Sequence, residues 1–301
     1  MPNAANKRCG YIAIVGRPNV GKSTLLNCII GQKVCITSRK AQTTRHRILA
    51  VKTEQNTQCI FLDTPGLSQR MSGALNKTLK KTALHALREV DVVLWCVSAA
   101  EQHDDDLWVL DQCRQLSVPV FAVINQIDRL SSRDAVLPYI DYVKSLAKFQ
   151  EIVPISAKKG DGVAALHALL GPLLPTVPHF FFPEDQVSDR SDRFTISELV
   201  REQCLYRFGQ EVPHQVAVQV EHMAVTNHVL HIQVLIWVAR PGQKTILLGQ
   251  KGAHLKLIGE RVRKVCETVF AQKVCLKTWV KVKKDWSERQ QDIRFLGYDE
   301  S

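Results

Sequence analysis

The eight residues GRPNVGKS at positions 16–23 place two glycines, a lysine and a hydroxyl at fixed spacing. Glycines let the backbone turn so that successive N–H groups point at one anion. The lysine brings a positive charge to the outer phosphates of a nucleotide, and the hydroxyl can coordinate Mg²⁺. The spacing therefore predicts a phosphate-binding loop. Its expected nucleotide contacts are Gly16, Arg17, Pro18, Asn19, Val20, Gly21, Lys22, Ser23 and Thr24.

A second motif, NQID at positions 125–128, follows an apolar run over 118–124. A carboxylate at Asp128 can accept hydrogen bonds from the ring N–H and the exocyclic amine of guanine, whereas adenine has no such pair of donors. The motif therefore predicts selection of GTP over ATP. A loop over 156–158 follows a further apolar run and is expected to close over the base. The residues predicted at the base are Asn125, Gln126, Asp128, Ser156, Ala157 and Lys158.

A third motif, DTPG at positions 63–66, lies between these two. The Asp63 carboxylate can hold Mg²⁺ through its water shell, and the Gly66 N–H can meet the γ-phosphate. Many switch GTPases next have a glutamine that orients the attacking water, but Leu67 stands here and predicts slow hydrolysis without an activator. Further nucleotide contacts are predicted at Asp63, Thr64, Pro65, Gly66 and Leu67, and a catalytic role at Asn19, Lys22 and Gly66.

The expected Mg²⁺ ligands are Ser23, Asp63 and either Thr43 or Thr44, between which the sequence does not decide. A threonine that binds the ion only in the GTP state would order the segment 32–48 and release it after hydrolysis. The sequence thus predicts a nucleotide-dependent switch.

Alternating strand-like and helical runs must position these motifs. Through residue 172 they predict a doubly wound α/β P-loop GTPase domain, with a mostly parallel sheet and the nucleotide loops at the carboxyl ends of its strands. Prolines then punctuate an interdomain linker over 173–194, because proline cannot continue a helix. The run 180–182, three phenylalanines, suggests a membrane contact or packing between domains, and the second is favoured.

The remaining chain, 195–301, has the predicted order helix, two strands, two helices and strand, followed by a C-terminal helix. This α+β order, with G-x-x-G at 249–252 between the paired helices, resembles a type II KH domain, a module that binds single-stranded RNA. The two glycines would let phosphates approach the backbone, and Lys251 would add a charge-assisted contact. The RNA contacts predicted here are Gly249, Gln250, Lys251, Gly252 and Lys256.

Basic charge is concentrated in the same region. The chain has 301 residues and a net charge of +11. Residues 240–284 carry twelve Lys and Arg against two acids, whereas 173–239 carry four against eight. Such a block is the footprint expected of a nucleic-acid site, with a solvated face that binds nothing as the alternative.

The ordered motifs resemble those of translation-factor-related GTPases. The segments GQKVCITSRKAQTTRHRI at 31–48, FPEDQVSDRSDRF at 182–194 and WVKVKKDWSERQQDIRFLGY at 279–298 resemble the Era family of bacterial ribosome-assembly GTPases. That resemblance implies a GTP/GDP switch that binds the 3′ end of 16S ribosomal RNA and assists maturation of the small ribosomal subunit. Asn19 resembles an asparagine that binds K⁺ in related GTPases. The family usually has lysine where Gln126 stands, so reduced guanine affinity is expected.

The composition limits the classes of protein to which this chain can belong. An apolar content of 45% with 23% charged residues describes a globular chain. Polar residues lead directly into the first strand run, so no signal peptide is expected, and no apolar run is long enough to span a membrane. Nine scattered cysteines without a C-x-x-C pair predict buried thiols in a reducing cytoplasm. We expect a monomer and leave peripheral association with the inner face of the cell membrane open.

Two other functions stay open from the residues alone. One is an RNA-binding assembly chaperone whose nucleotide site is structural. The other is a housekeeping nucleotide hydrolase whose basic block is incidental. GTP turnover separates the GTPase switch from the first alternative, and RNA binding by the C-terminal part separates it from the second.

Overall fold

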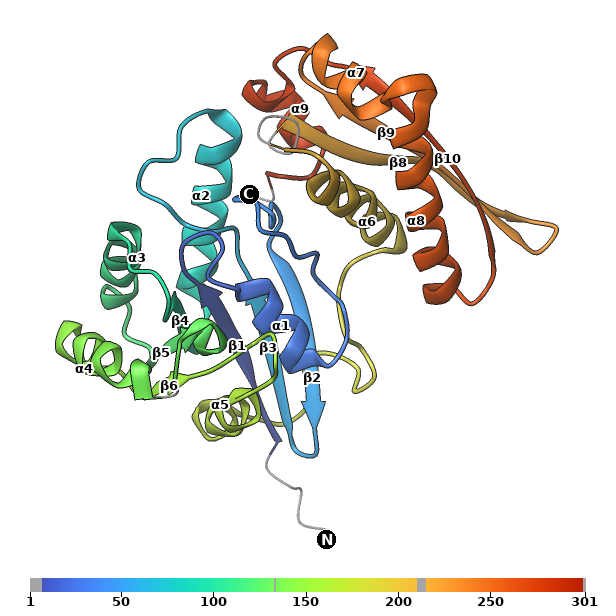
Figure 1. The fold of residues 1–301 in the computed structure, drawn as a ribbon. Helices are drawn as coiled ribbons and strands as arrows, with labels where there is room; N and C mark the ends of the chain where they lie inside the picture. The colour runs from blue at the N-terminus through green and yellow to red at the C-terminus, as the bar shows by residue number, and fades with distance from the viewer. Residues whose placement is uncertain (1–6, 133, 210–214, 300–301) are drawn as a thin grey trace, which may run out of the picture.

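The computed structural model describes residues 7–132, 134–209 and 215–299. Its ribbon contains two sheets, each with its own helices (Figure 1). The first sheet is formed by residues before 178 and the second by residues after 215. This division into an α/β part and an α+β part agrees with the predicted fold class.

The first sheet has seven strands, and the predicted mostly parallel arrangement is confirmed. Its order is β2 (Ile48–Glu54), β3 (Thr57–Asp63), β1 (Lys7–Val15), β4 (Val92–Ser98), β5 (Val120–Asn125) and β6 (Ile152–Pro154), with β2 antiparallel to β3. The phosphate-binding loop follows β1, whereas the other two motifs begin at the last residues of β3 and β5. The parallel strands therefore bring all three motifs to one edge of the sheet.

Helices cover both faces of this sheet (Figure 1). One face carries α2 (Ala74–Ala86), α3 (Asp104–Arg114) and α4 (Leu137–Leu146), and the other carries α1 (Lys22–Ile30) and α5 (Val163–Leu170). Successive side chains of a strand point to opposite faces. Accordingly, Ala13 packs into the core beneath α2, α3 and α4, and Ile14 packs into the core beneath α1 and α5. Both faces are buried, which accounts for the continuous apolar runs of these strands.

The second sheet has the strand order β10 (Lys273–Val282), β9 (Val229–Val238) and β8 (Val216–Thr226). The central strand β9 is parallel to β10 and antiparallel to β8. One core joins this sheet to α6 (Asp192–Arg207), α7 (Pro241–Leu248) and α8 (Ala253–Val269). The order helix, two strands, two helices and strand confirms the predicted KH architecture.

A separate apolar cluster joins the two parts of the chain. Leu75 and Leu79 of α2 share it with Leu235 and Trp237 of β9. The short helix α9 (Gln290–Phe295) contributes Ile293 to the same cluster. The helix that follows the DTPG motif therefore shares one apolar cluster with the KH sheet and contacts α9.

The linker lies along the first sheet. Its strand β7 (Thr176–Val177) pairs antiparallel with the start of β1, a feature that the sequence analysis did not predict. The interpretation of the three phenylalanines as interdomain packing is wrong, because Phe180 and Phe182 pack against the core of the first sheet. Gln58 explains this position, since its side-chain oxygen accepts hydrogen bonds from the N–H groups of Phe181 and Phe182.

All nine cysteines lie in the described part of the chain as free thiols, as predicted. Seven of them are buried. Burial raises the pKa of the Cys96 and Cys204 thiols to about 12, so both stay protonated. Within the ranges that the structure describes, we find no helix with the length and apolarity needed to cross a membrane.

Candidate functional site: a nucleotide pocket and an RNA-binding loop

The phosphate-binding loop is fitted so tightly that its glycines cannot be replaced. A Cβ on Gly16 would lie 2.3 Å from the carbonyl oxygen of Cys96, and one on Gly21 would lie 2.4 Å from Nδ2 of Asn125. Both glycines also have positive φ angles, +156° and +95°, as does Asn19 at +67°. Their small size is therefore required by packing as well as by the turn itself.

Lys22 occupies the centre of this loop. Its Nζ donates to the carbonyl oxygens of Gly16 and Arg17, at 3.0 Å each. The residue is buried, and desolvation lowers the pKa of its ammonium group, while the nearby Asp63 carboxylate opposes the shift. The loop thus holds a cationic group in place before any phosphate arrives.

Ser23, Thr44 and Asp63 meet beside Lys22. The Ser23 hydroxyl lies 2.7 Å from Oδ2 of Asp63 and 2.8 Å from the Thr44 hydroxyl, which itself donates to Oδ2 at 3.2 Å. Thr43 points elsewhere, with its hydroxyl 2.6 Å from that of Ser38. The sequence does not decide which of the two threonines is a metal ligand. In the structure Thr44, and not Thr43, lies beside the predicted ligands Ser23 and Asp63.

The Asp63 carboxylate is fully buried in this cluster. Burial raises its pKa, whereas Lys22 and the hydroxyls of Ser23 and Thr44 oppose the rise. Its other oxygen, Oδ1, has no hydrogen-bond partner among the described residues. A buried carboxylate with an unused oxygen next to two hydroxyls is a donor set suited to a hard divalent cation.

The remaining DTPG residues pack against the phosphate-binding loop. A Cβ on Gly66 would lie 2.8 Å from backbone atoms of Pro18, so this position also requires glycine. The Thr64 hydroxyl donates to the carbonyl oxygen of Ile14 at 3.0 Å, and Pro65 is buried. Leu67 is completely buried in the core, and its N–H donates to the carbonyl oxygen of Gly16 at 3.1 Å. Its side chain therefore packs into the core rather than toward the phosphate-binding loop.

Asn125 connects the base-binding motif to two other loops. Its Nδ2 donates to the carbonyl oxygen of Val20 at 2.8 Å, and its Oδ1 accepts from the N–H of Ala157 at 3.0 Å. Ser156 then donates to Oδ1 of Asp128 at 2.7 Å, which orients the carboxylate predicted to select guanine. Lys158 is exposed next to them, and Thr24 lies in the first turn of α1.

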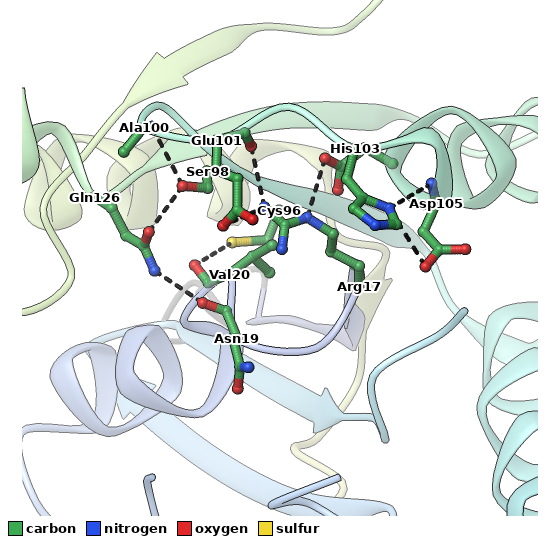
Figure 2. A network of polar contacts seen from close by, with 12 residues as sticks. Arg17, Asn19, Val20, Cys96, Ser98, Ala100, Glu101, His103, Asp105 and Gln126 are labelled. Atoms are coloured by element: carbon green, nitrogen blue, oxygen red, sulfur yellow. Dashed lines mark hydrogen bonds and ion pairs between the residues drawn. The ribbon is translucent and has the colours of Figure 1, made fainter. Parts of the chain in front are cut away.

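Gln126 also bonds to the phosphate-binding loop, as Figure 2 shows. Its Nε2 donates to the carbonyl oxygen of Asn19 at 2.9 Å, and its Oε1 accepts from the Ser98 hydroxyl at 2.8 Å. Its backbone adopts the left-handed conformation with φ of +67°. Five predicted segments, at 16–24, 44, 63–67, 125–128 and 156–158, are thus gathered at one edge of the sheet.

Sequence reasoning missed the partner of Arg17. The Arg17 guanidinium lies 3.2 Å from a carboxylate oxygen of Asp106. It also donates to the carbonyl oxygen of Glu101 at 3.0 Å (Figure 2). Both charged groups of this ion pair are buried. The pair ties the phosphate-binding loop to the start of α3. Asp106 is the last of three consecutive aspartates, and nothing in their order distinguishes it.

The segment 32–48 is held by the second domain. Arg201 of α6 donates to the carbonyl oxygen of Thr43, and the carboxylate of Glu202 accepts from the N–H of Thr37 at 3.1 Å. Arg45, which is almost completely buried, donates to the carbonyl oxygen of Val216 at 2.7 Å. These contacts flank Thr44, so the predicted metal ligand sits in a segment anchored to the KH domain.

His46 fills the same interface. Its ring lies 4.9 Å from that of Phe194 in an edge-to-face contact and 4.7 Å from that of Tyr298. Burial lowers the pKa of His46 to about 4, with Glu198 opposing the shift and Arg190 and Arg201 adding to it. The imidazole is therefore neutral near pH 7.

The G-x-x-G loop lies on the surface between α7 and α8. Gly249 has φ of +67°, and a Cβ there would lie 2.6 Å from the ring of His254. Gly252 has φ of +79° but no atom within 4 Å of an added Cβ. Between them, Gln250 and Lys251 are exposed, and Lys256 is exposed one turn into α8. The loop thus presents backbone and positive charge to an incoming ligand.

Comparisons with known proteins agree with both predicted domains, the GTPase domain and the KH domain. The family model described as 50S ribosome-binding GTPase matches residues 11–126, and the KH domain model matches residues 211–287. GTPase Era from Pseudomonas putida strain W619 is 47% identical over 291 residues, covering 97% of each chain. GTPase Era from Ectopseudomonas mendocina strain ymp is 46% identical over 298 residues, covering 99% of each chain.

Two solved structures match the whole architecture. One is a crystal structure of Era in complex with MgGDPNP and a segment of 16S ribosomal RNA, with a TM-score of 0.94 and 40% identity. The other is a variant of Aquifex aeolicus Era bound to GDP and AlF₄⁻, with a TM-score of 0.92 and 39% identity. Each alignment covers 97% of this chain and 99% of the matched chain. Given this similarity along nearly its full length, the chain belongs to the Era family of GTPases.

Proposed function

We propose that the protein binds GTP with Mg²⁺ and hydrolyses it to GDP and phosphate. The meeting of Ser23, Thr44 and Asp63, with oxygen–oxygen distances of 2.7–3.2 Å, carries this proposal. Hydroxyl and carboxylate oxygens are the ligands that Mg²⁺ prefers, and Lys22 lies beside them. When bound, the ion would neutralise charge on the phosphates. The Era structure with MgGDPNP supports the same assignment.

Guanine selection is assigned to Asp128. Ser156 fixes one carboxylate oxygen by a 2.7 Å hydrogen bond, and this leaves the other available to the base. Ala157 and Lys158 belong to the same loop, which Asn125 holds in place. An oriented carboxylate can accept the paired donors of guanine without rearranging.

Hydrolysis is proposed to be slow without help. The residue after the DTPG motif, Leu67, is buried in the core and cannot orient a water molecule. Asn19 is exposed in the phosphate-binding loop, where a K⁺ ion would add positive charge. The Gly66 N–H is assigned to the γ-phosphate and Lys22 to the β- and γ-phosphates.

The second domain is proposed to bind the 3′ end of 16S ribosomal RNA and so assist maturation of the small ribosomal subunit. The Era structure that contains this RNA supports the assignment, as do the open loop at 249–252 and the surrounding basic residues. Phosphates would approach Gly252, with Lys251 and Lys256 beside them. The free thiols suit a reducing compartment, and we place the protein in the cytoplasm.

The two activities are proposed to be coupled through the segment 32–48. Thr44 belongs to the metal cluster, whereas its neighbours Thr43 and Arg45 are bonded to the KH domain. A change of the nucleotide that moves Thr44 must therefore act on these bonds. The protein would then bind RNA with different affinities in its GTP and GDP states.

The adjacent threonines provide a matched test. Thr44→Ala should weaken Mg²⁺-dependent binding of GTP about tenfold or more, since a ligand is lost, and should slow turnover. Thr43→Ala should change both little, because that hydroxyl bonds to Ser38 and Lys40 instead. RNA affinity is measured in parallel with GDP and with a non-hydrolysable GTP analogue, using an oligonucleotide of the 16S 3′ end.

The coupling is read from the same experiment. We expect the wild type and Thr43→Ala to bind the RNA differently in the two nucleotide states, and Thr44→Ala to lose that difference. Equal effects of the two substitutions would overturn the metal assignment. Equal RNA affinity of the wild type in both states would overturn the coupling.

A further inference from the structure

Gln126 has a single hydrogen-bonding orientation. Its amide has one oxygen and one NH₂ group, and the Asn19 carbonyl oxygen requires the NH₂ group. The oxygen accepts from two donors, the Ser98 hydroxyl and Nη1 of Arg129, both at 2.8 Å. Exchanging the two ends of the amide would set NH₂ against the Arg129 guanidinium and carbonyl against carbonyl. The side chain is therefore locked across the edge of the nucleotide site.

One of the three partners of Gln126, Arg129, is a cation. Arg129 ends the 3₁₀ turn Ile127–Arg129, and in such a turn residues three apart lie on the same side. Arg129 is exposed, and its guanidinium group is held beside the Gln126 amide, which itself bonds to the phosphate-binding loop. The same turn thus presents the carboxylate that selects guanine and, one residue later, a positive charge.

We propose that Arg129 and Gln126 together replace the lysine that the motif usually has. Gln126 fastens the base-binding loop to Asn19, and Arg129 supplies the missing cation against the purine ring, on whose face a planar guanidinium can stack. This inference rests on the proposed guanine site. It makes Arg129 a nucleotide-binding residue that no motif indicates.

Two properties would distinguish an Arg129 that contacts the base from an ordinary surface arginine. An arginine that only braces the turn would stabilise the protein with or without nucleotide. An arginine that contacts the base would affect affinity for GDP and GTP alike and leave the melting temperature without nucleotide unchanged. Its effect would also depend on residue 126, because a lysine there provides the charge itself.

The test is a double-mutant cycle on the full-length protein, read as the Kd for fluorescently labelled GDP. Arg129→Ala should weaken binding about tenfold, and Arg129→Lys should weaken it less because the charge is kept. Gln126→Lys alone should gain little, since two cations then repel each other. Combining Gln126→Lys with Arg129→Ala should restore nearly the wild-type affinity. Lys144→Ala, on the exposed face of α4, is the control for loss of a remote positive charge.

Two results would overturn the inference. One is wild-type affinity of Arg129→Ala for GDP. The other is an equal loss from Arg129→Ala in the wild-type and Gln126→Lys backgrounds, which would mean that the arginine acts through the fold alone. Competition with ADP tests the proposed function separately. If ADP displaces the label from the wild type as well as GDP does, the guanine site itself is refuted.

Discussion

Two glycine loops precede helices in this molecule, and they are built differently. In the nucleotide loop a Cβ on Gly16 or Gly21 would collide with neighbouring atoms at 2.3–2.4 Å, and Lys22 is buried. In the KH loop a Cβ on Gly249 would meet the His254 ring at 2.6 Å, but one on Gly252 would meet nothing within 4 Å, and Lys251 is exposed. The first loop is assembled by the protein before its ligand binds, whereas the second is left open for its ligand to complete.

The difference follows from the ligands that we propose. A nucleotide phosphate is small and enters a cavity where each donor must already point inward, so preorganisation is favourable. Single-stranded RNA is long and lies across a surface, so an accessible backbone and exposed positive charge are sufficient. Substitutions of Gly16 or Gly21 should therefore affect the fold and the ligand together, while those of Gly252 should act chiefly on the ligand.

The largest effect is expected from Lys22→Ala. The bound phosphates would lose a buried counter-charge that the Gly16 and Arg17 carbonyl oxygens now hold in place. We expect a loss of about 3 kcal/mol or more in nucleotide affinity, the scale for breaking a buried charge pair. Isothermal titration with GDP measures this. RNA affinity without nucleotide should stay at the wild-type value, and an equal fall in both affinities would contradict the comparison.

Gly252→Asp tests the open loop. A carboxylate would meet the incoming phosphate, and we expect RNA affinity to fall by at least about 2 kcal/mol without change in GTP binding. Gly252→Asn is the matched control. Asparagine and aspartate both tolerate the φ of +79°, but asparagine carries no charge. Wild-type RNA affinity should also fall steeply with added salt. Binding by Gly252→Asp at wild-type strength would mean that the basic block is a solvated face.

The sequence predicts those features that depend on residues close together in the chain, and it does not predict those that depend on residues far apart in it. Residues 16–23 follow one strand and begin one helix, so their arrangement could be predicted from spacing alone. Thr43 and Thr44 are adjacent and chemically identical, and only the packing of the segment 32–48 decides which one meets Asp63. The Arg17–Asp106 pair joins residues 89 positions apart, and no spacing rule indicates it.

The interface between the two domains is also inaccessible to sequence reasoning. His46 carries no motif, yet it lies between Phe194 and Tyr298, two residues brought in from distant parts of the chain. The same holds for Leu75, which shares one apolar cluster with Leu235 and Trp237 of the KH sheet. Patterns of residues identify elements and sites, but the contacts that connect sites arise only when separate elements pack together.

A pH titration tests this interface. The pKa of His46 falls from 6.5 to about 4 on burial, so its stabilising contribution is complete above about pH 6.5 and is lost as the pH falls toward 4. At pH 5 the loss should reach about 2 kcal/mol. His46→Phe keeps an aromatic ring without a titrating group, so its melting temperature should fall less between pH 7 and 5. Parallel curves for the two proteins would exclude this role of His46.

The smallest effect concerns K⁺ at the mouth of the nucleotide loop. If the Asn19 side chain binds K⁺, GTP turnover should be several-fold faster in KCl than in NaCl, because the ion adds positive charge where negative charge develops. Asn19 has a φ of +67°, so Asn19→Gly removes the side chain without straining the backbone and keeps the carbonyl oxygen that Gln126 binds. This variant should turn over GTP equally in both salts while its affinity for GDP is unchanged. A wild type that is indifferent to the two cations would refute the K⁺ site and leave the preassembled phosphate loop as the whole of the catalytic arrangement.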